Sequence, residues 1–165
     1  KLAQETLEMK NNLHQTLPYY QEELQLENDC IVHGDFHNNN LFFDHKGQIT
    51  AIFDLEKTEY APRLFELIRS IDYSCFYTGI DDFGYQLTAS YLKSYNQIFP
   101  IDKQMFQIAL KAYLISKSNN LWIENEHYIK NNHRVDILLN QEYSVLKYIQ
   151  TNHTKFISKL LSYLE

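Results

Sequence analysis

Glycine is scarce in this sequence of 165 residues. It occurs four times, at Gly34, Gly47, Gly79 and Gly84. No two of these positions are close enough to form a phosphate-cradling loop of the G-x-G type. The common glycine-rich nucleotide sites are therefore excluded from this stretch of chain.

Cysteine, long apolar runs and positive charge are scarce as well. The two cysteines, Cys30 and Cys75, lie far apart, which favours reduced thiols in a cytoplasmic protein over a disulfide. The sequence contains no run of about 18 apolar residues, so no membrane-spanning helix is predicted. No signal-peptide pattern is present at its start. The formal net charge is −6 and no basic stripe is visible, which argues against nucleic acid and anionic membranes as partners.

The sequence does contain enough apolar residues for one folded domain. Hydrophobic residues make up 44% of it and charged residues 22%, as in globular, soluble proteins. Residues 1–17 carry apolar side chains at steps of three and four, which predicts a helix. Beyond Pro18, Tyr20 and Leu24 lie on the face of a continuing or new helix. Residues 30–33 form a short apolar run that predicts a strand.

Two further strands are predicted at 40–44 and 49–54, and helices follow them. The intervening HKGQ supplies a glycine turn, so the two strands should form a hairpin. After Pro62 the apolar spacing is helical to the end of the sequence, with a last helix over 135–163. The first of these helices is expected to bury Leu64, Leu67, Ile68 and Ile71. The second is expected to bury Phe83, Leu87, Tyr91, Tyr95 and Ile98.

The stretch IVHGDFHNNNLFF, residues 31–43, holds the densest chemistry, and two interpretations compete for it. In the first, the alternating His33, Asp35 and His37 bind a metal, as in metallophosphoesterases. Such a site needs more ligands elsewhere, and no second Asp-x-His or Gly-Asn-His set is present. The isolated histidines are expected to be solvated surface side chains, which gives a His-rich zinc site little support; they are His14, His127, His133 and His153.

In the second interpretation, the same stretch serves phosphoryl transfer. A kinase catalytic loop has the pattern H-x-D-x-x-x-x-N, in which the Asp orients the acceptor hydroxyl and accepts its proton. Residues 33–40, HGDFHNNN, match it completely. A hairpin should follow whose second strand leads to a metal-binding Asp, and ITAIFD ends in Asp54. The hairpin would return Asp54 to the side of Asn40, so that two oxygen ligands face one Mg²⁺.

These residues, in this order, resemble the aminoglycoside phosphotransferase and choline kinase family, through HGDFHNNNLFF and AIFDLE. The resemblance covers about residues 28–72 and implies a protein-kinase-like fold, with ATP as phosphate donor. It also implies that Asp35 is the catalytic Asp and that Asn40 and Asp54 bind Mg²⁺. In EYAPRLFELIRSI, Glu66 takes an acidic position that is usually Asp. Phe53 departs from the family's I-D-x-E pattern, in which Ile is usual.

Three side chains near the loop have roles that the sequence leaves open. His33 is expected to brace the loop backbone and to take no direct part in the chemistry. His37 either donates a hydrogen bond to the transferred phosphate or lines the loop. Glu56, two residues beyond Asp54, either tunes the metal site, binds a cationic substrate or is solvated.

Two other motifs bear on the same function. DDFG at 81–84 contains the Asp-Phe-Gly of protein kinases, but it lies 47 residues beyond Asp35, counted to Asp82. No predicted strand precedes it, so its aspartates are expected to cap a helix. The run LWIENEH places Trp122 near Glu124 and Glu126. This group either binds an ammonium substrate or packs in the core.

The sequence thus predicts an α+β, mostly α-helical fold, a single domain over residues 1–165 whose small β-hairpin carries the catalytic and metal-binding residues. By the resemblance it is the C-terminal lobe of a kinase-like fold. The N-terminal nucleotide lobe, which would supply a phosphate-covering loop and a Lys, is expected to lie outside residues 1–165. The isolated lobe is therefore expected to be inactive.

The expected activity is ATP- and Mg²⁺-dependent phosphorylation of a small-molecule hydroxyl. Aminoglycosides, choline, homoserine and sugars are acceptors of similar proteins, and the acidity of the chain mildly favours a cationic one. The donor, ATP or GTP, cannot be distinguished from these residues. The alternative is a non-catalytic kinase-like lobe that acts as a binding module, and a metallophosphoesterase is the less supported third reading.

Overall fold

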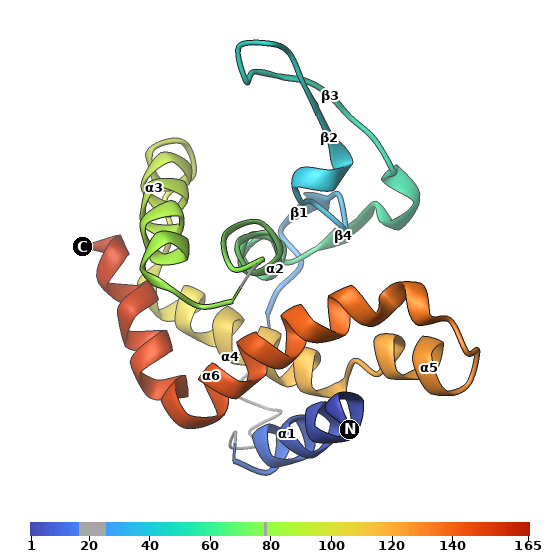
Figure 1. Ribbon diagram of the computed structural model, residues 1–165. Coiled ribbons are helices and arrows are strands. Elements are labelled where there is room, and N and C mark those ends of the chain that lie inside the picture. The colour runs from blue at the N-terminus through green and yellow to red at the C-terminus, as the bar shows by residue number, and fades with distance from the viewer. Residues whose placement is uncertain (17–25, 78) are drawn as a thin grey trace.

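The computed structural model describes residues 1–16, 26–77 and 79–165, and within them the protein is mostly helical (Figure 1). The predicted helical continuation at Pro18, Tyr20 and Leu24 lies outside the described residues. The helices are α1 (Leu2–Thr16), α2 (Arg63–Cys75), α3 (Asp82–Ile98), α4 (Lys103–Asn119), α5 (Trp122–Tyr128) and α6 (Asp136–Leu161). The strands are β1 (Cys30–Val32), β2 (Leu41–Phe43), β3 (Ile49–Ile52) and β4 (Glu59–Ala61).

The four strands of the described residues form two small antiparallel sheets. Strands β2 and β3 make the expected hairpin, with Leu41 opposite Ile52 and an irregularity between Phe42 and Phe43. Its turn uses Gly47 at φ 76°, a backbone conformation that glycine adopts without a steric cost. Strand β1 pairs instead with β4, which the sequence did not predict, and Cys30 faces Ala61 there. Figure 1 shows the β2–β3 hairpin projecting away from the helices.

The helical core is built around α2, which lies between the hairpin and the other helices (Figure 1). The predicted buried face of α2 is confirmed, because Leu64, Leu67, Ile68 and Ile71 are all buried. They pack in one cluster with side chains of α1, α3, α4 and α6. Among the described helices, none combines the length and the apolarity that crossing a membrane requires.

The buried face of α3 differs in part from the predicted one: Tyr91 and Tyr95 pack against the core as expected, but Phe83, Leu87 and Ile98 do not. Phe83 and Ile98 are about 70% exposed, and the helix buries Tyr85, Thr88 and Leu92 instead. Tyr85 packs edge-on against Phe76. Thr88 is tolerated inside because its hydroxyl donates to the Gly84 carbonyl oxygen one turn earlier. Apolar spacing alone does not indicate which of two apolar faces of a helix is buried, because that depends on where the neighbouring helices pack.

A group of charged side chains is buried where α1, α5 and α6 meet. Lys10 of α1 lies 2.7 Å from Glu124 of α5 and 3.3 Å from Glu142 of α6. Its ammonium also donates to the Asn120 carbonyl oxygen. All three charged side chains are less than a tenth exposed. The ion pairs therefore tie the N-terminal helix to the two helices that begin beyond α4.

Candidate active site

The loop between β1 and β2 carries the HGDFHNNN motif, and two side chains of α2 hold its backbone. The Glu66 carboxylate accepts hydrogen bonds from the backbone N–H groups of Gly34 (2.6 Å) and Phe36 (3.0 Å). Arg69, one turn further along α2, donates to the Gly34 carbonyl oxygen and to the Asp35 carboxylate. Because the two side chains are three residues apart, they project from the same face of the helix. The helix thus fixes the backbone on both sides of Asp35.

Asp35 is surrounded by positive charge. Its Oδ1 lies 2.6 Å from Arg69 Nη2, and its Oδ2 lies 2.8 Å from Lys57 Nζ. The Nε2 atom of His37 lies 3.7 Å from the same carboxylate. Burial raises the pKa of Asp35, but the hydrogen bond from Lys57 and the charges of Arg69 and Lys57 outweigh it and bring the pKa below its usual value. The carboxylate is therefore ionised at neutral pH and able to accept a proton.

Gly34 is required by the close approach of another part of the chain. Its φ is 79°, and a Cβ atom added there would lie 2.1 Å from the Lys57 carbonyl oxygen. No other residue type fits this contact without moving the backbone. The short 3-10 turn Leu55–Lys57 (η2) is in this way pressed against the motif loop, which places Lys57 beside Asp35.

Asn40 and Asp54 lie at the same end of the hairpin. The Asn40 side chain is buried and donates through its Nδ2 to the Asp35 carbonyl oxygen (2.8 Å). The Asn40 carbonyl oxygen accepts from the backbone N–H of Phe53, which precedes Asp54. This bond orients the amide, and the amide oxygen is its only atom that could bind a cation, since the NH₂ group is a donor alone. An exposed carboxylate and an amide oxygen are ligands of the type that Mg²⁺ takes.

Asp54 has an unusual backbone conformation. Its φ and ψ are 61° and 54°, the left-handed region that few residues other than glycine enter. Aspartate and asparagine enter it more readily than most because their short side chains can bond locally. Residues held in such conformations are concentrated at functional sites, which draws attention to Asp54 independently of the motif.

The two histidines of the motif have different surroundings. His33 accepts through Nδ1 from the Asp35 backbone N–H (3.2 Å), so its Nε2–H donates to the Phe53 carbonyl oxygen (2.8 Å). It therefore ties the loop to the residue before Asp54. His37 accepts through Nδ1 from the Asn39 N–H, and burial lowers its pKa, with Arg69 acting in the same direction. A neutral His37 then carries its proton on Nε2, on the side of Asp35.

A cleft of about 460 Å³ opens beside this loop. Asp35 and His37 of the loop line it together with residues of α2, α4, α5 and α6. The α2 contribution includes Asp72, whose carboxylate lies 2.7 Å from Lys117 and accepts from the Tyr113 hydroxyl. Burial lowers the pKa of Lys117, but Asp72 and Glu142 outweigh it and raise that pKa, so the ammonium stays charged. Volumes of this size are typical of small-molecule sites.

The structure separates some of the other candidate residues from the cleft. Trp122 lines it, about half exposed. Glu124 is buried against Lys10, and Glu126 bonds with Lys130 and Asn132. The three do not form one ammonium site. Glu56 is exposed and is not part of the cleft lining in the described residues.

The DDFG motif takes the helix-capping role that was predicted for its aspartates. Asp81 is the N-cap of α3, and its side chain accepts from the Gly84 backbone N–H (2.7 Å). Both aspartates are exposed, at the start of α3. This match to the kinase triplet is therefore a coincidence of sequence.

The sequence did not reveal four charged residues around Asp35 and the cleft, namely Lys57, Arg69, Asp72 and Lys117. Lys57 follows Asp54 by three residues, but nothing in its neighbours indicates a partner 22 residues away. Arg69 and Asp72 lie on one side of α2, at a spacing of three from Glu66. That regular spacing of charged residues along the helix is the sequence signal that could have indicated Arg69 and Asp72.

Comparisons with known proteins identify the family. The family model described as the phosphotransferase enzyme family matches residues 1–98, more than half of the 165 residues. The matched range includes the motif loop, the hairpin and all of α2. Neither the curated proteins nor the solved structures yield a match. On the family match, and in agreement with the resemblance carried by the motif, this chain belongs to the phosphotransferase enzyme family.

Proposed function

We propose that the protein transfers the γ-phosphoryl group of ATP to a hydroxyl of a small molecule, with Mg²⁺ as cofactor. In this proposal residues 1–165 are the lobe that carries the catalytic loop and binds the acceptor. The lobe that clamps ATP is supplied by residues outside this range. Two free thiols, Cys30 and Cys75, suit the cytoplasm as the place of action.

One observation carries the proposal: Asp35 is held at the wall of the cleft by contacts from both sides. Glu66 and Arg69 fix its backbone, Asn40 bonds to its carbonyl oxygen, and its carboxylate faces the space where an acceptor would lie. Phosphoryl transfer requires mainly positioning and charge, and little covalent chemistry from the protein. A rigid, ionised carboxylate beside a small-molecule cleft meets that requirement.

The chain's own residues have distinct parts in the mechanism. The acceptor hydroxyl bonds to Asp35 Oδ2 in the place of the Lys57 ammonium, whose side chain is 62% exposed. Asp35 orients the hydroxyl and takes its proton as the new O–P bond forms. His37 Nε2–H and Arg69 lie beside the same carboxylate and face the charge of the incoming phosphoryl group. Mg²⁺, held by Asn40 and Asp54, would neutralise charge on the phosphates.

The surface of the hairpin supports the presence of a second lobe. Five apolar side chains near the hairpin are each about half exposed: Phe42, Phe43, Ile49, Ile52 and Leu55. A patch of exposed apolar residues on a soluble protein usually marks a surface that a partner covers. It lies at the end of the molecule that holds Asn40 and Asp54, where the nucleotide has to bind. We therefore assign this patch to the contact with the nucleotide lobe.

The cleft lining restricts the acceptor only by class. Three acidic side chains and three basic ones line it, apart from His37: Asp35, Asp72, Glu142, Lys57, Arg69 and Lys117. The balance favours neither sign of net charge. Three aromatic residues in the lining, Tyr73, Tyr77 and Trp122, are each about half exposed. Such rings suit the apolar faces of a polyhydroxylated ring or an ammonium group, so sugar-like and cationic alcohols are both tested.

The test uses the protein with both lobes and a panel of such alcohols, with ADP release as the readout. Asp35→Asn keeps the shape of the side chain and removes the proton-accepting charge, and such assistance is typically worth about 10²–10⁴-fold. We expect turnover to fall by that factor and ATP affinity to change little. Asp82→Asn, in the helix-capping motif, is the matched control and should leave the rate unchanged.

Two outcomes would count against the proposal. If Asp35→Asn retains wild-type turnover, Asp35 has no part in the chemistry. If no alcohol stimulates ADP release and ligands only raise the thermal midpoint, the protein is the alternative of a binding module with an inactive kinase-like lobe.

A further inference from the structure

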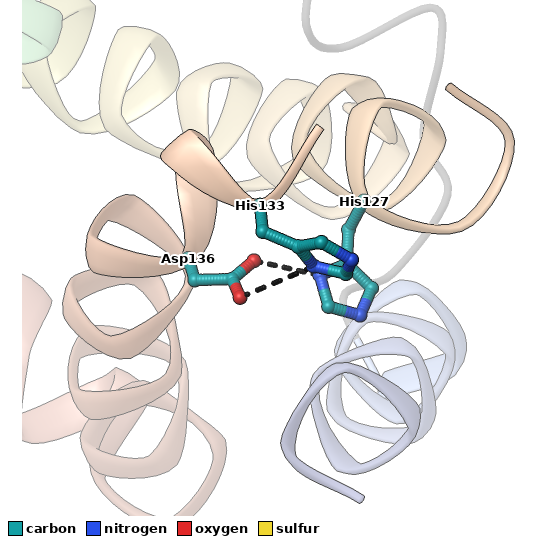
Figure 2. A group of neighbouring side chains, drawn as sticks. All are labelled: His127, His133 and Asp136. Atoms are coloured by element: carbon teal, nitrogen blue, oxygen red, sulfur yellow. Dashed lines mark hydrogen bonds and ion pairs between the residues drawn. The ribbon is translucent and has the colours of Figure 1, made fainter. Parts of the chain in front are cut away.

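A cluster of metal-binding side chain types lies at the junction of α5 and α6, away from the candidate active site. His127 is in the last turn of α5, His133 begins the 3-10 turn His133–Val135, and Asp136 begins α6. Figure 2 shows the three side chains turned toward one another across this junction. One ligand atom from each lies within 4.8 Å of the other two. Within the described residues, no other group of three His, Cys, Asp or Glu side chains meets this condition.

The distances fit a small cation with nitrogen and oxygen ligands. His127 Nδ1 lies 2.6 Å from Asp136 Oδ1, and His133 Nδ1 lies 3.5 Å from Asp136 Oδ2. Around a tetrahedral zinc ion with bonds of about 2.0–2.1 Å, neighbouring ligand atoms are separated by about 3.4 Å. Small side-chain rotations would therefore bring the three atoms to one ion. The two imidazole rings already stand at 81° with centroids 4.9 Å apart, so they do not stack face to face.

Contacts outside the three side chains orient one of the histidines. The Nε2 atom of His133 lies 3.0 Å from the Asn131 side-chain oxygen. Metal-binding histidines almost always donate their other ring N–H to such an oxygen, which fixes the ring and the nitrogen that faces the metal. The loop itself is held by Glu126, which accepts from Lys130 and from the Asn132 side chain. The arrangement is thus supported before any ion arrives.

The cluster is open to solvent on the side where an ion would enter. The side chains of His127, His133 and Asp136 are 22%, 58% and 43% exposed. Imidazole ligands suit zinc, copper and nickel, whereas Mg²⁺ and Ca²⁺ prefer oxygen ligands alone. Three protein ligands would leave a fourth position of a tetrahedral ion for water.

We propose that His127, His133 and Asp136 bind one zinc-class divalent transition-metal ion. The ion joins the end of α5 to the start of α6. Because α5 begins at Trp122, which lines the cleft, the ion holds one wall of the cleft in place. This site is separate from the Mg²⁺ ligands of the proposed reaction and does not depend on that reaction.

The test is a Zn²⁺ titration of the chelator-treated protein, with calorimetry in the presence of a competing chelator as the readout. We expect one Zn²⁺ per chain to bind, and a rise in the thermal midpoint on binding. Excess Mg²⁺ should not displace it. His127→Gln, His133→Gln and Asp136→Asn should each weaken binding by at least about tenfold, the lower end of the cost of losing even an outer-shell partner.

Matched variants separate this site from adventitious binding. His45→Gln changes an exposed histidine of the hairpin turn, and His37→Gln removes one beside Asp35, and both should leave the affinity unchanged. Asn131→Gly removes the amide that orients His133 but tolerates the φ of 52° at this position, and should cost about 10–100-fold.

The absorption spectrum of bound Co²⁺ gives a second measurement on the unaltered protein. A tetrahedral site produces intense visible bands, and His127→Gln should abolish or shift them. Equal Zn²⁺ affinity in the three ligand variants would overturn the proposal. So would an octahedral Co²⁺ spectrum, or loss of binding in His37→Gln alone. In those cases the cluster is only a hydrogen-bonded surface group.

Discussion

Replacing Lys10 by methionine should destabilise the protein strongly at neutral pH. The Lys10 side chain is 2% exposed, and its ammonium neutralises Glu124 and Glu142, which are 3% and 8% exposed. Methionine fills nearly the same volume but leaves both carboxylates buried and without Lys10. Breaking a buried ion pair on one side typically costs about 3–5 kcal/mol. If the free energy of unfolding falls by about 2 kcal/mol for each 1 M urea, the urea concentration at the unfolding midpoint should fall by about 1.5–2.5 M.

The loss should depend on pH in a direction that identifies its cause. Burial already raises the pKa of Glu142, although Lys117 and Lys10 lower it. Removing Lys10 raises that pKa further above the value in the unfolded chain. The folded variant then binds more protons than the unfolded one, so its stability rises as the pH falls toward the raised pKa. The difference from wild type should therefore be largest at pH 7 and smaller near pH 5.

Urea unfolding followed by circular dichroism at the two pH values measures both effects. Lys93→Met, at an exposed site on α3, makes the same chemical change and should stay within about 0.5 kcal/mol of wild type. Adding Glu124→Leu to Lys10→Met should recover part of the loss, because an apolar pair can replace a buried ionic one. A loss below about 1 kcal/mol at pH 7, or one that does not change with pH, would refute the reasoning.

Two further predictions concern the motif loop and the hairpin. Asp54→Asn keeps the left-handed backbone but weakens the proposed Mg²⁺ site, so its lost activity should recover in part at high magnesium. An increase in rate with magnesium no greater than that of Asp82→Asn would contradict the assignment. Gly34→Ala should lower both the thermal midpoint and the activity, because its Cβ meets the Lys57 carbonyl oxygen. Gly47→Ala, at nearly the same φ but in open space, should cost only the strain of about 1–2 kcal/mol, and equal losses in the two variants would refute the contact.

The parts of the site that are local in sequence were predictable. The loop, the hairpin and the return of the chain to Asp54 follow from eight motif residues and one glycine turn, because hairpins are set by short-range signals. The pairing of β1 with β4 was not predictable, since it joins segments about 30 residues apart. That the lobe belongs to an active enzyme stays a prediction.

Features that depend on packing between helices escaped the sequence. Arg69 reaches Asp35 only because α2 lies under the loop, and nothing near either residue in the sequence encodes that contact. The face of α3 was assigned to Phe83 and Ile98 because they are apolar, whereas the neighbouring helices selected Tyr85 and Leu92. His127 and His133 were each expected to be isolated surface residues, and the turn before α6 brings them together with Asp136.

The backbone conformation of Asp54 has a consequence for how such proteins diverge. Asparagine and glycine are the residues that tolerate φ near 61° best, and each is one nucleotide substitution away from an aspartate codon. Either change would remove the carboxylate while preserving the turn, the hairpin and the core. On the proposed role of Asp54 in binding Mg²⁺, descendants that lose activity through this position would therefore keep their fold intact. A survey of inactive relatives should find Asn and Gly there far more often than Glu, although Glu would conserve the charge.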